Sequence, residues 1–265
     1  MRLLGLATRV LRRAYMECRC LCWEINRRLR QAVTVSTKRG MFTMLLAAEE
    51  SIGRMLYCTR ECELELMWES MAFLRSVEKC PPKGEGCIVD VGANNGLISI
   101  GMLQARELER AIALEPEPRN LSVLQHNVNQ NGLVVRAICL PYAVTGRERR
   151  IQLELSDRHR GDHRVRANPD AVDSAGSFNE SRRRTITIES IRLDNLLDRL
   201  LESFTRKIAV VWVDVQGCEG HEFLGARKLL SKGVPVISGI WPYGIVRAGM
   251  SQEEFCDIAT GIWPS

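Results

Sequence analysis

The sequence has no stretch of 18 or more apolar residues, so a transmembrane helix is not expected. No small-residue cleavage site follows its first residues, which argues against a secretory signal peptide. Its ten cysteines include no C-x-x-C pair, so zinc ribbons and thioredoxin-like chemistry have no support. We interpret these scattered cysteines as free thiols in a reducing compartment, which predicts a cytoplasmic protein.

Internal repeats are absent too, and the composition of 45% apolar and 26% charged residues is ordinary for a globular chain of 265 residues. The net charge of +5 is unevenly placed. Residues 1–30, the basic head, hold eight arginines and two glutamates, whereas the rest of the chain has 29 basic and 30 acidic side chains. Nucleic-acid binding is not expected, because it needs a basic face across the fold. The head could make a peripheral contact with the inner face of a membrane or with a partner, or be an incidental amphipathic helix.

The segment before residue 86 predicts a helical extension followed by a hairpin and a second helix. Residues 3–30 have the apolar spacing of a helix, and residues 32–46 alternate around Lys38-Arg39-Gly40 as in a hairpin. Residues 61–79 return to the helical pattern, which the prolines at 81 and 82 end. We therefore expect a basic extension over 1–30, and a hairpin and helix over 31–85 that pack on the main domain.

From residue 86 to 265, apolar strands alternate with amphipathic helices. This alternation of strands and helices predicts an α/β fold with a mostly parallel sheet flanked by helices. The strands are predicted at residues 87–91, 111–114, 134–139, 208–213 and 234–240, and the helices at 97–104, 119–129, 191–201, 222–230 and 252–259. The alternation stops after residue 145, where β segments at 151–155 and 185–188 enclose a polar stretch. We interpret about 156–184 as a lid insertion.

Residues 90–96 read Asp-Val-Gly-Ala-Asn-Asn-Gly and join a predicted strand to a predicted helix. Gly92 allows a sharp turn and close approach of a ligand to the backbone, and Gly96 allows the helix to pack closely. Glu115 follows nineteen residues after Gly96, at the end of the second strand. This is where a doubly wound fold places the acid that binds the ribose hydroxyls of a nucleoside.

Two residues of this loop bear on which nucleoside is bound. A dinucleotide site needs a glycine where this sequence has Asn94, and Asp90 would repel a pyrophosphate. The cationic groups of S-adenosylmethionine would be attracted by Asp90. A methyl donor is therefore favoured over NAD, and an NAD-linked oxidoreductase stays as the alternative enzyme.

Together with Leu-Glu-Pro-Glu-Pro at 114–118 and Asp-Val-Gln-Gly-Cys-Glu-Gly at 214–220, this loop resembles the FkbM family of S-adenosylmethionine-dependent methyltransferases. The likeness runs from about residue 35 to 249 and includes Gly-Asp-His-Arg at 161–164 and Trp-Pro-Tyr-Gly at 241–244. It implies a Rossmann-like class I methyltransferase fold and methyl transfer to a hydroxyl oxygen of a sugar or secondary metabolite. The chain departs from the family at Gln216, where Glu is frequent. Class I methyltransferases usually finish with an antiparallel strand pair, and this sequence stops soon after the helix at 252–259, so we expect either an incomplete sheet or a truncated chain.

The resemblance and the strand ends together give the candidate site. Asp214 ends a buried strand and is expected to orient the acceptor or the sulfonium, with Glu219 as a second candidate and His163 as a base on the lid. Each has a structural alternative: Asp214 as a turn cap, Glu219 as a helix-dipole partner, His163 as a solvated side chain. No metal site is expected. The cofactor-binding candidates are Asp90, Gly92, Ala93, Asn94, Asn95, Gly96, Glu115, Pro116, Ala143 and Asp214.

The acceptor is expected to be a small molecule or a glycan with a free hydroxyl. The arginines of the lid could bind an anionic acceptor, although acidic residues between them favour solvation for most. Trp241 and Tyr243 offer flat surfaces for a sugar ring, and packing explains them equally well. A degenerate methyltransferase domain that serves as a non-catalytic binding module is the alternative outside enzymes.

Overall fold

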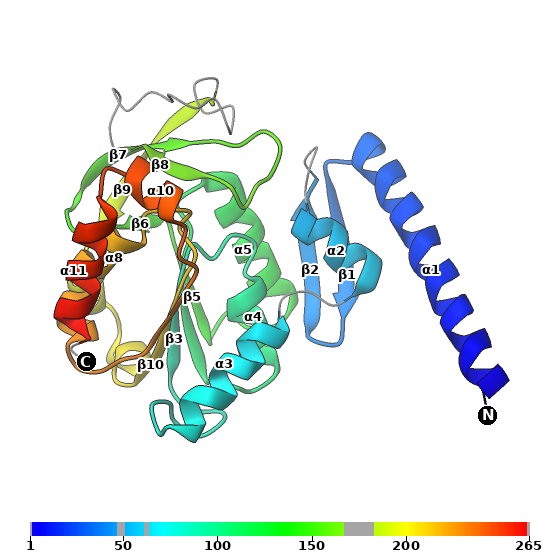
Figure 1. The fold of residues 1–265 in the computed structure, drawn as a ribbon, viewed down its shortest axis with the longest axis horizontal. Coiled ribbons are helices and arrows are strands. Elements are labelled where there is room, and N and C mark those ends of the chain that lie inside the picture. Colours follow the sequence, from blue (N-terminus) through cyan, green and yellow to red (C-terminus); the bar gives the residue numbers. More distant parts are fainter. Residues whose placement is uncertain (1, 47–50, 61–63, 167–182, 264–265) are drawn as a thin grey trace.

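The structure is a computed structural model that describes residues 2–46, 51–60, 64–166 and 183–263. It begins with a long helix, α1 (Arg2–Leu29), and an antiparallel hairpin of β1 (Ala32–Thr37) and β2 (Gly40–Leu45). Helices α2 (Ser51–Thr59) and α3 (Leu64–Ser76) follow. The sequence predicts α1, the hairpin and α3, but not α2. In Figure 1 the hairpin and α2 lie between α1 and the rest of the molecule.

The centre of the molecule is a five-stranded parallel sheet, as predicted. Its strand order is β11-β10-β3-β4-β5, so the order reverses beside β3. Ligands of open α/β sheets bind at such a reversal, outside the carboxyl ends of the strands. The strands are β3 (Cys87–Val91), β4 (Arg110–Leu114), β5 (Ala137–Leu140), β10 (Ile208–Val213) and β11 (Val236–Ser238).

Both faces of this sheet are covered, which explains why its strands are mostly apolar. Successive side chains of a strand point to opposite faces. Ile88 packs in one hydrophobic cluster with Leu124, whereas Val89 and Val91 pack in another with Phe223. The helices of this domain are α4 (Leu97–Gln104), α5 (Pro118–Gln130), α6 (Leu193–Leu197), α7 (Glu202–Thr205), α8 (Glu219–Gly225), α9 (Arg227–Leu230), α10 (Pro242–Arg247) and α11 (Gln252–Ile262).

Several predicted boundaries are wrong. The third strand starts three residues later than expected, and the helix expected over 191–201 is formed only from Leu193 to Leu197. The helix expected over 222–230 is divided at Ala226 into α8 and α9. Helix α10 was not expected, although Pro242 at its first turn suits a helix start. Except for α10, the apolar pattern predicts the element and leaves its ends undetermined.

A second, four-stranded sheet has the order β6-β9-β7-β8. It contains β6 (Tyr142–Val144), β7 (Arg149–Glu154), β8 (Arg164–Arg166) and β9 (Thr185–Ile191). The sequence predicts β7 and β9 but neither β6 nor β8. Strand β8 lies inside the predicted lid, and residues 167–182 of that lid lie outside the described residues. Figure 1 shows this sheet at the upper end of the parallel sheet.

The N-terminal elements share a core with the parallel sheet. Trp23 of α1 and Phe42 of β2 belong to the same hydrophobic cluster as Ile88 of β3. The side-chain amide of Asn127 in α5 also joins the hairpin, because it accepts a hydrogen bond from the Thr43 amide and donates one to the Thr43 carbonyl. None of the described helices combines the length and the apolarity that crossing a bilayer would need.

Candidate functional site

A cavity of about 420 Å³ lies at the reversal of strand order. Its floor comes from residues that follow the ends of the parallel strands: Gly92 after β3, Glu115 after β4 and Asp214 after β10. The second sheet supplies other walls, among them Ala143 from β6 and Val165 from β8. The cavity therefore lies where open α/β sheets bind their ligands.

The glycine loop is shaped by contacts within the protein. Gly92 has a φ of 83°, and a Cβ there would lie 2.1 Å from the carbonyl oxygen of Asp214. Any other residue at 92 would push the end of β10 away from the loop. The amides of Gly92 and Ala93 both donate to the carbonyl of Leu114. The loop thus joins the ends of β3, β4 and β10 and sets the width of the cavity floor.

Asn94 occupies the position at which a dinucleotide site needs glycine. Its φ of 50° lies in the left-handed region, which asparagine adopts more readily than most residues. In this conformation the Asn94 amide donates to Oε2 of Glu115 at 2.8 Å. The backbone of the loop therefore holds the side chain of Glu115, which lies between β4 and α5.

Glu115 is held by two backbone amides. Its Oε2 accepts from Asn94 and its Oε1 from the Glu117 amide at 2.9 Å. Each carboxylate oxygen can accept a further hydrogen bond, so two ribose hydroxyls can be accommodated. Burial, together with the negative charges of Glu117 and Asp90, raises the pKa of Glu115 to about 7 against the opposing effect of the two amide hydrogen bonds.

Asp90 is buried beneath the loop and does not line the cavity. Its Oδ2 accepts from the amide of Ser99 at 3.1 Å and from its hydroxyl at 2.6 Å, which anchors helix α4. Burial raises the pKa of Asp90 to about 6. Ala93, Asn95 and Gly96 likewise shape the loop and lie outside the cavity lining.

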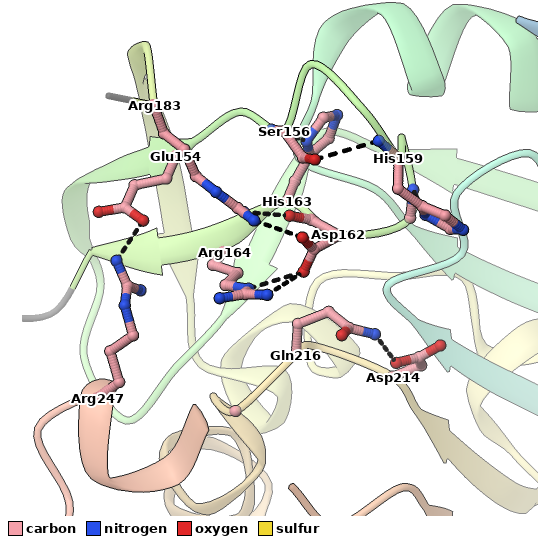
Figure 2. A network of polar contacts seen from close by, with 12 residues as sticks. Glu154, Ser156, His159, Asp162, His163, Arg164, Arg183, Asp214, Gln216 and Arg247 are labelled. Atoms are coloured by element: carbon pink, nitrogen blue, oxygen red, sulfur yellow. Dashed lines mark hydrogen bonds and ion pairs between the residues drawn. The ribbon is translucent and has the colours of Figure 1, made fainter. Parts of the chain in front are cut away.

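Asp214 is exposed at the cavity floor. Its amide donates to the carbonyl of Val91 at 3.0 Å, and its Oδ1 accepts from Nε2 of Gln216 at 2.6 Å (Figure 2). A glutamate at 216 would place a second negative charge beside Asp214. The amide found here instead donates a hydrogen bond and so fixes the rotation of the Asp214 carboxylate.

Glu219 lies behind the floor, outside the cavity lining. It is buried in the first turn of α8, where its Oε1 accepts from the Gly217 amide at 3.0 Å. Burial raises its pKa. In this position Glu219 holds the turn that carries Gln216, and the structure does not bring it to the cavity together with Asp214.

His163 does line the cavity, and its hydrogen bonding determines its protonation. Its Nδ1 accepts from the backbone amide of Ser156 at 3.0 Å, so the proton of the neutral ring lies on Nε2. Nε2 is buried and has no hydrogen-bond partner among the described residues. Burial lowers the pKa of His163 to about 4, with Arg160 and Arg183 acting in the same direction and Glu117 and Asp162 against it.

Two carboxylates of this region each bind a pair of arginines. Asp162 accepts hydrogen bonds from Arg164 at 2.7 Å and from Arg183. Glu154 is the second, and it joins β7 to β8 through Arg166 and to α10 through Arg247. Figure 2 shows Arg164 and Arg183 converging on Asp162. Arg164 and Arg183 are therefore structural, unlike most arginines of the lid, which the sequence predicts to be solvated.

The aromatic pair of the Trp-Pro-Tyr-Gly motif packs beside the cavity. The rings of Trp241 and Tyr243 are 5.2 Å apart, and the guanidinium of Arg164 lies 4.4 Å from the centre of the Trp241 ring. Neither aromatic side chain is part of the lining. Their observed positions therefore fit a role in packing better than a role in stacking on a sugar ring.

The sequence does not predict several other residues of the cavity lining. Ile52 and Tyr142 come from α2 and β6, which were not predicted. Asn120 lies in the first turn of α5, where its side chain donates to the carbonyl of Arg160 at 3.2 Å. A polar residue just after Glu115 in the chain could have been suspected, but nothing in the sequence pairs it with residue 160.

The charges at the cavity floor favour a cationic ligand. The charge of Asp214 raises the pKa of Asp90, whose own charge raises that of Glu115, so the three carboxylates share one electrostatic environment. A ligand with a positive charge at this point would relieve their repulsion. Among the described residues, no group of three or more His, Cys, Asp or Glu side chains could hold a metal ion.

Comparison with known proteins gives a family match. The family model "Methyltransferase FkbM domain" matches residues 90–260, well over half of the chain. A 2-O-methyltransferase NoeI from Sinorhizobium fredii is 26% identical over an alignment of 174 residues, and the match covers 62% of this chain and 66% of that protein. The match therefore spans slightly less than two thirds of this relative.

Solved structures of methyltransferases are similar to the chain at lower identity. A methyltransferase FkbM from Methylobacillus flagellatus is 18% identical with a TM-score of 0.44, over 79% of this chain and 45% of that one. Trm5 from Methanocaldococcus jannaschii, solved in complex with adenosine, is 15% identical with a TM-score of 0.29, over 42% and 29% of the two chains.

Proposed function

This chain belongs to the FkbM methyltransferase domain family, and from that premise we propose that it transfers the methyl group of S-adenosylmethionine to a hydroxyl oxygen. The observation that carries the proposal is the position of Glu115. Its carboxylate lines the cavity at the reversal of strand order, is fixed by two amides, and can still accept two hydrogen bonds. A ribose with two free hydroxyls matches this acceptor.

The lining residues fit both the nucleoside part and the sulfonium part of the cofactor. Glu115 would bind the ribose, and Pro116 and Ala143 would contact the base, while Gly92 and Asp214 line the floor beyond them. The carboxylates of Glu115 and Asp214 line the cavity and that of Asp90 lies beneath its floor, so their combined negative charge suits a sulfonium. Of the ten residues predicted to bind the cofactor, Gly92, Asn94, Glu115, Pro116, Ala143 and Asp214 line the cavity, and Asp90, Ala93, Asn95 and Gly96 support the loop.

The cofactor supplies an electrophilic methyl group, so the protein must align a hydroxyl and accept its proton. We assign the proton acceptor to Asp214, because it is exposed at the cavity floor and Gln216 fixes its orientation. His163 is not suited to this role. Its Nδ1 already accepts from Ser156, and its Nε2 carries the proton.

The acceptor is proposed to be a small hydroxylated molecule or a glycan. The wall opposite the floor mixes polar and charged residues such as Asp162 and Arg164 with Leu153 and Val165, as sugar-binding surfaces do. The relative from S. fredii is named a 2-O-methyltransferase, which supports oxygen as the accepting atom. Reducing conditions that keep the cysteines as thiols would fit a cytoplasmic site of action.

Turnover tests this proposal directly. The protein is incubated with S-adenosylmethionine carrying an isotope-labelled methyl group and a panel of sugars and hydroxylated metabolites, and products are read by mass spectrometry. We expect a labelled methyl ether on at least one acceptor. Asp214→Asn, which keeps the shape but not the basicity, should reduce the rate by about 10²–10⁴-fold and leave cofactor affinity within a few-fold.

Three outcomes would contradict the assignment. Cofactor binding without turnover on any hydroxylated acceptor would favour the degenerate binding module. Binding of NADH in place of the methyl donor would favour the NAD-linked oxidoreductase. Loss of folding in Asp214→Asn would show that Asp214 is a turn cap.

A further inference from the structure

Within residues 13–29, whose side chains the structure describes, helix α1 contacts the rest of the molecule through one side. Trp23 is almost completely buried, and its ring lies 5.5 Å from that of Tyr57 in α2. Arg19 donates to the carbonyl of Tyr57 at 2.7 Å, and Cys20 contacts Cys58. These contacts determine the rotation of α1 about its axis, and therefore which residues face away from the protein.

The opposite side of α1 is apolar and exposed. Leu21, Ile25 and Leu29 are spaced by four residues and are 63%, 50% and 77% exposed. At 3.6 residues per turn, these three fall with their apolar neighbours in a sector of about 120°. We call this surface the outer stripe. It consists of Tyr15, Cys18, Leu21, Cys22, Ile25 and Leu29.

The charge beside the outer stripe is positive. From residue 13 to 30 there are five arginines and two glutamates, and both glutamates form ion pairs with arginines of the same helix. Arg28 and Arg30 are exposed on either side of Leu29 and form no ion pair within the described part of the chain. The chain after residue 30 has a net charge of −1. The net positive charge of the protein therefore comes from residues 1–30, which include the helix that carries the stripe.

The apolar stripe and the arginines beside it favour a lipid surface over a second copy of the chain as the binding partner. A second copy of α1 would cover the stripe but bring its own arginines against these. An anionic lipid surface accepts the apolar side chains at the boundary of headgroups and acyl chains, and neutralises the arginines beside them. Figure 1 shows α1 at one end of the molecule, with the hairpin and α2 on one side of it only.

We propose that the outer stripe of α1 docks on an anionic membrane surface, with the helix lying in the plane of the interface. The stripe supplies the apolar contact, and the exposed arginines beside it, Arg28 and Arg30, supply the attraction to the headgroups. The cavity is not part of this contact, so cofactor binding and docking are separable.

Vesicle binding tests the proposal. The full chain is mixed with vesicles of phosphatidylcholine containing about one third phosphatidylglycerol, and its partition coefficient is measured by co-sedimentation. We expect binding that falls strongly with phosphatidylcholine alone and in about 0.5 M salt. Leu21→Gln, Ile25→Gln and Leu29→Gln together should lower the coefficient at least about tenfold. Arg28→Gln with Arg30→Gln should lower it by about fivefold per arginine.

The controls separate docking from folding. Val134, Val135 and Leu201 are equally exposed apolar residues outside α1, and their replacement by Gln should leave the coefficient unchanged. All variants should keep the wild-type affinity for S-adenosylhomocysteine. Equal binding to neutral and anionic vesicles, or wild-type binding by the α1 triple variant, would overturn the proposal. A concentration-dependent dimer in light scattering that the triple variant abolishes would assign the stripe to a second copy instead.

Discussion

Cofactor affinity should depend on pH through Glu115. The pKa of this carboxyl is about 7 because the side chain is buried among other acids. Only the ionised form offers both oxygens as acceptors, so the ribose hydroxyls should bind that form and lower the pKa in the complex. A proton must leave before the cofactor binds wherever the carboxyl is protonated in the free protein.

The magnitude follows from this pKa. If the ligand binds only the ionised carboxyl, the apparent Kd is multiplied by about 1.1 at pH 8 and by about 11 at pH 6. Affinity should therefore weaken about tenfold between these values, which corresponds to about 1.4 kcal/mol. At pH 7 about half of the Glu115 carboxyls are protonated, so binding should release about half a proton for each ligand.

Isothermal titration with S-adenosylhomocysteine at pH 6, 7 and 8, in buffers of different ionisation enthalpy, measures both quantities. Glu115→Gln is the matched control, since it keeps the shape and cannot ionise. It should bind about 10- to 100-fold more weakly at pH 8, because it loses charge-assisted hydrogen bonds, and should show no slope. Equal wild-type affinity at pH 6 and pH 8, or the same slope in Glu115→Gln, would show that Glu115 does not control the pH dependence of binding.

Three further predictions concern neighbouring residues. His163→Phe should leave the pH profile of turnover unchanged, because the ring has no available basic nitrogen, and loss of an acidic limb from the profile would contradict this. Gln216→Glu should shift the rising limb of turnover to higher pH, since a negative charge beside Asp214 raises the pKa of that carboxyl, while cofactor affinity measured by calorimetry stays within a few-fold. Trp23→Ala should lower the free energy of unfolding by about 3–5 kcal/mol, as for a fully buried tryptophan, whereas an effect below 1 kcal/mol in denaturant unfolding would place α1 outside the core.

The parallel sheet and the glycine loop were predictable from the sequence. The strands around Val89 and Val211 are short apolar runs between helices, and burial on both faces requires such runs. Glu115 could be assigned because its distance from the loop is set by one helix and one strand. Local periodicity was sufficient for these elements.

The second sheet and the N-terminal packing could not be predicted in the same way. Strands β6 and β8 have three residues each, too few for an alternating pattern to show. The sequence treats residues 1–30 as an extension, yet Trp23 lies in the same cluster as Ile88, a contact that no local signal reports. The expected basic role of His163 also depended on which of its nitrogens accepts from Ser156, and spacing carries no information on that.

The central claim is that the cavity at the strand ends binds a methyl donor through Glu115. Calorimetric titration of the wild type and Glu115→Ala with S-adenosylhomocysteine, with NADH as the competing ligand, tests it most directly. We predict one binding site for S-adenosylhomocysteine in the wild type, at least about tenfold weaker binding in Glu115→Ala, and no binding of NADH. Absence of S-adenosylhomocysteine binding by the folded wild type, or equal binding by the folded variant, would contradict the claim.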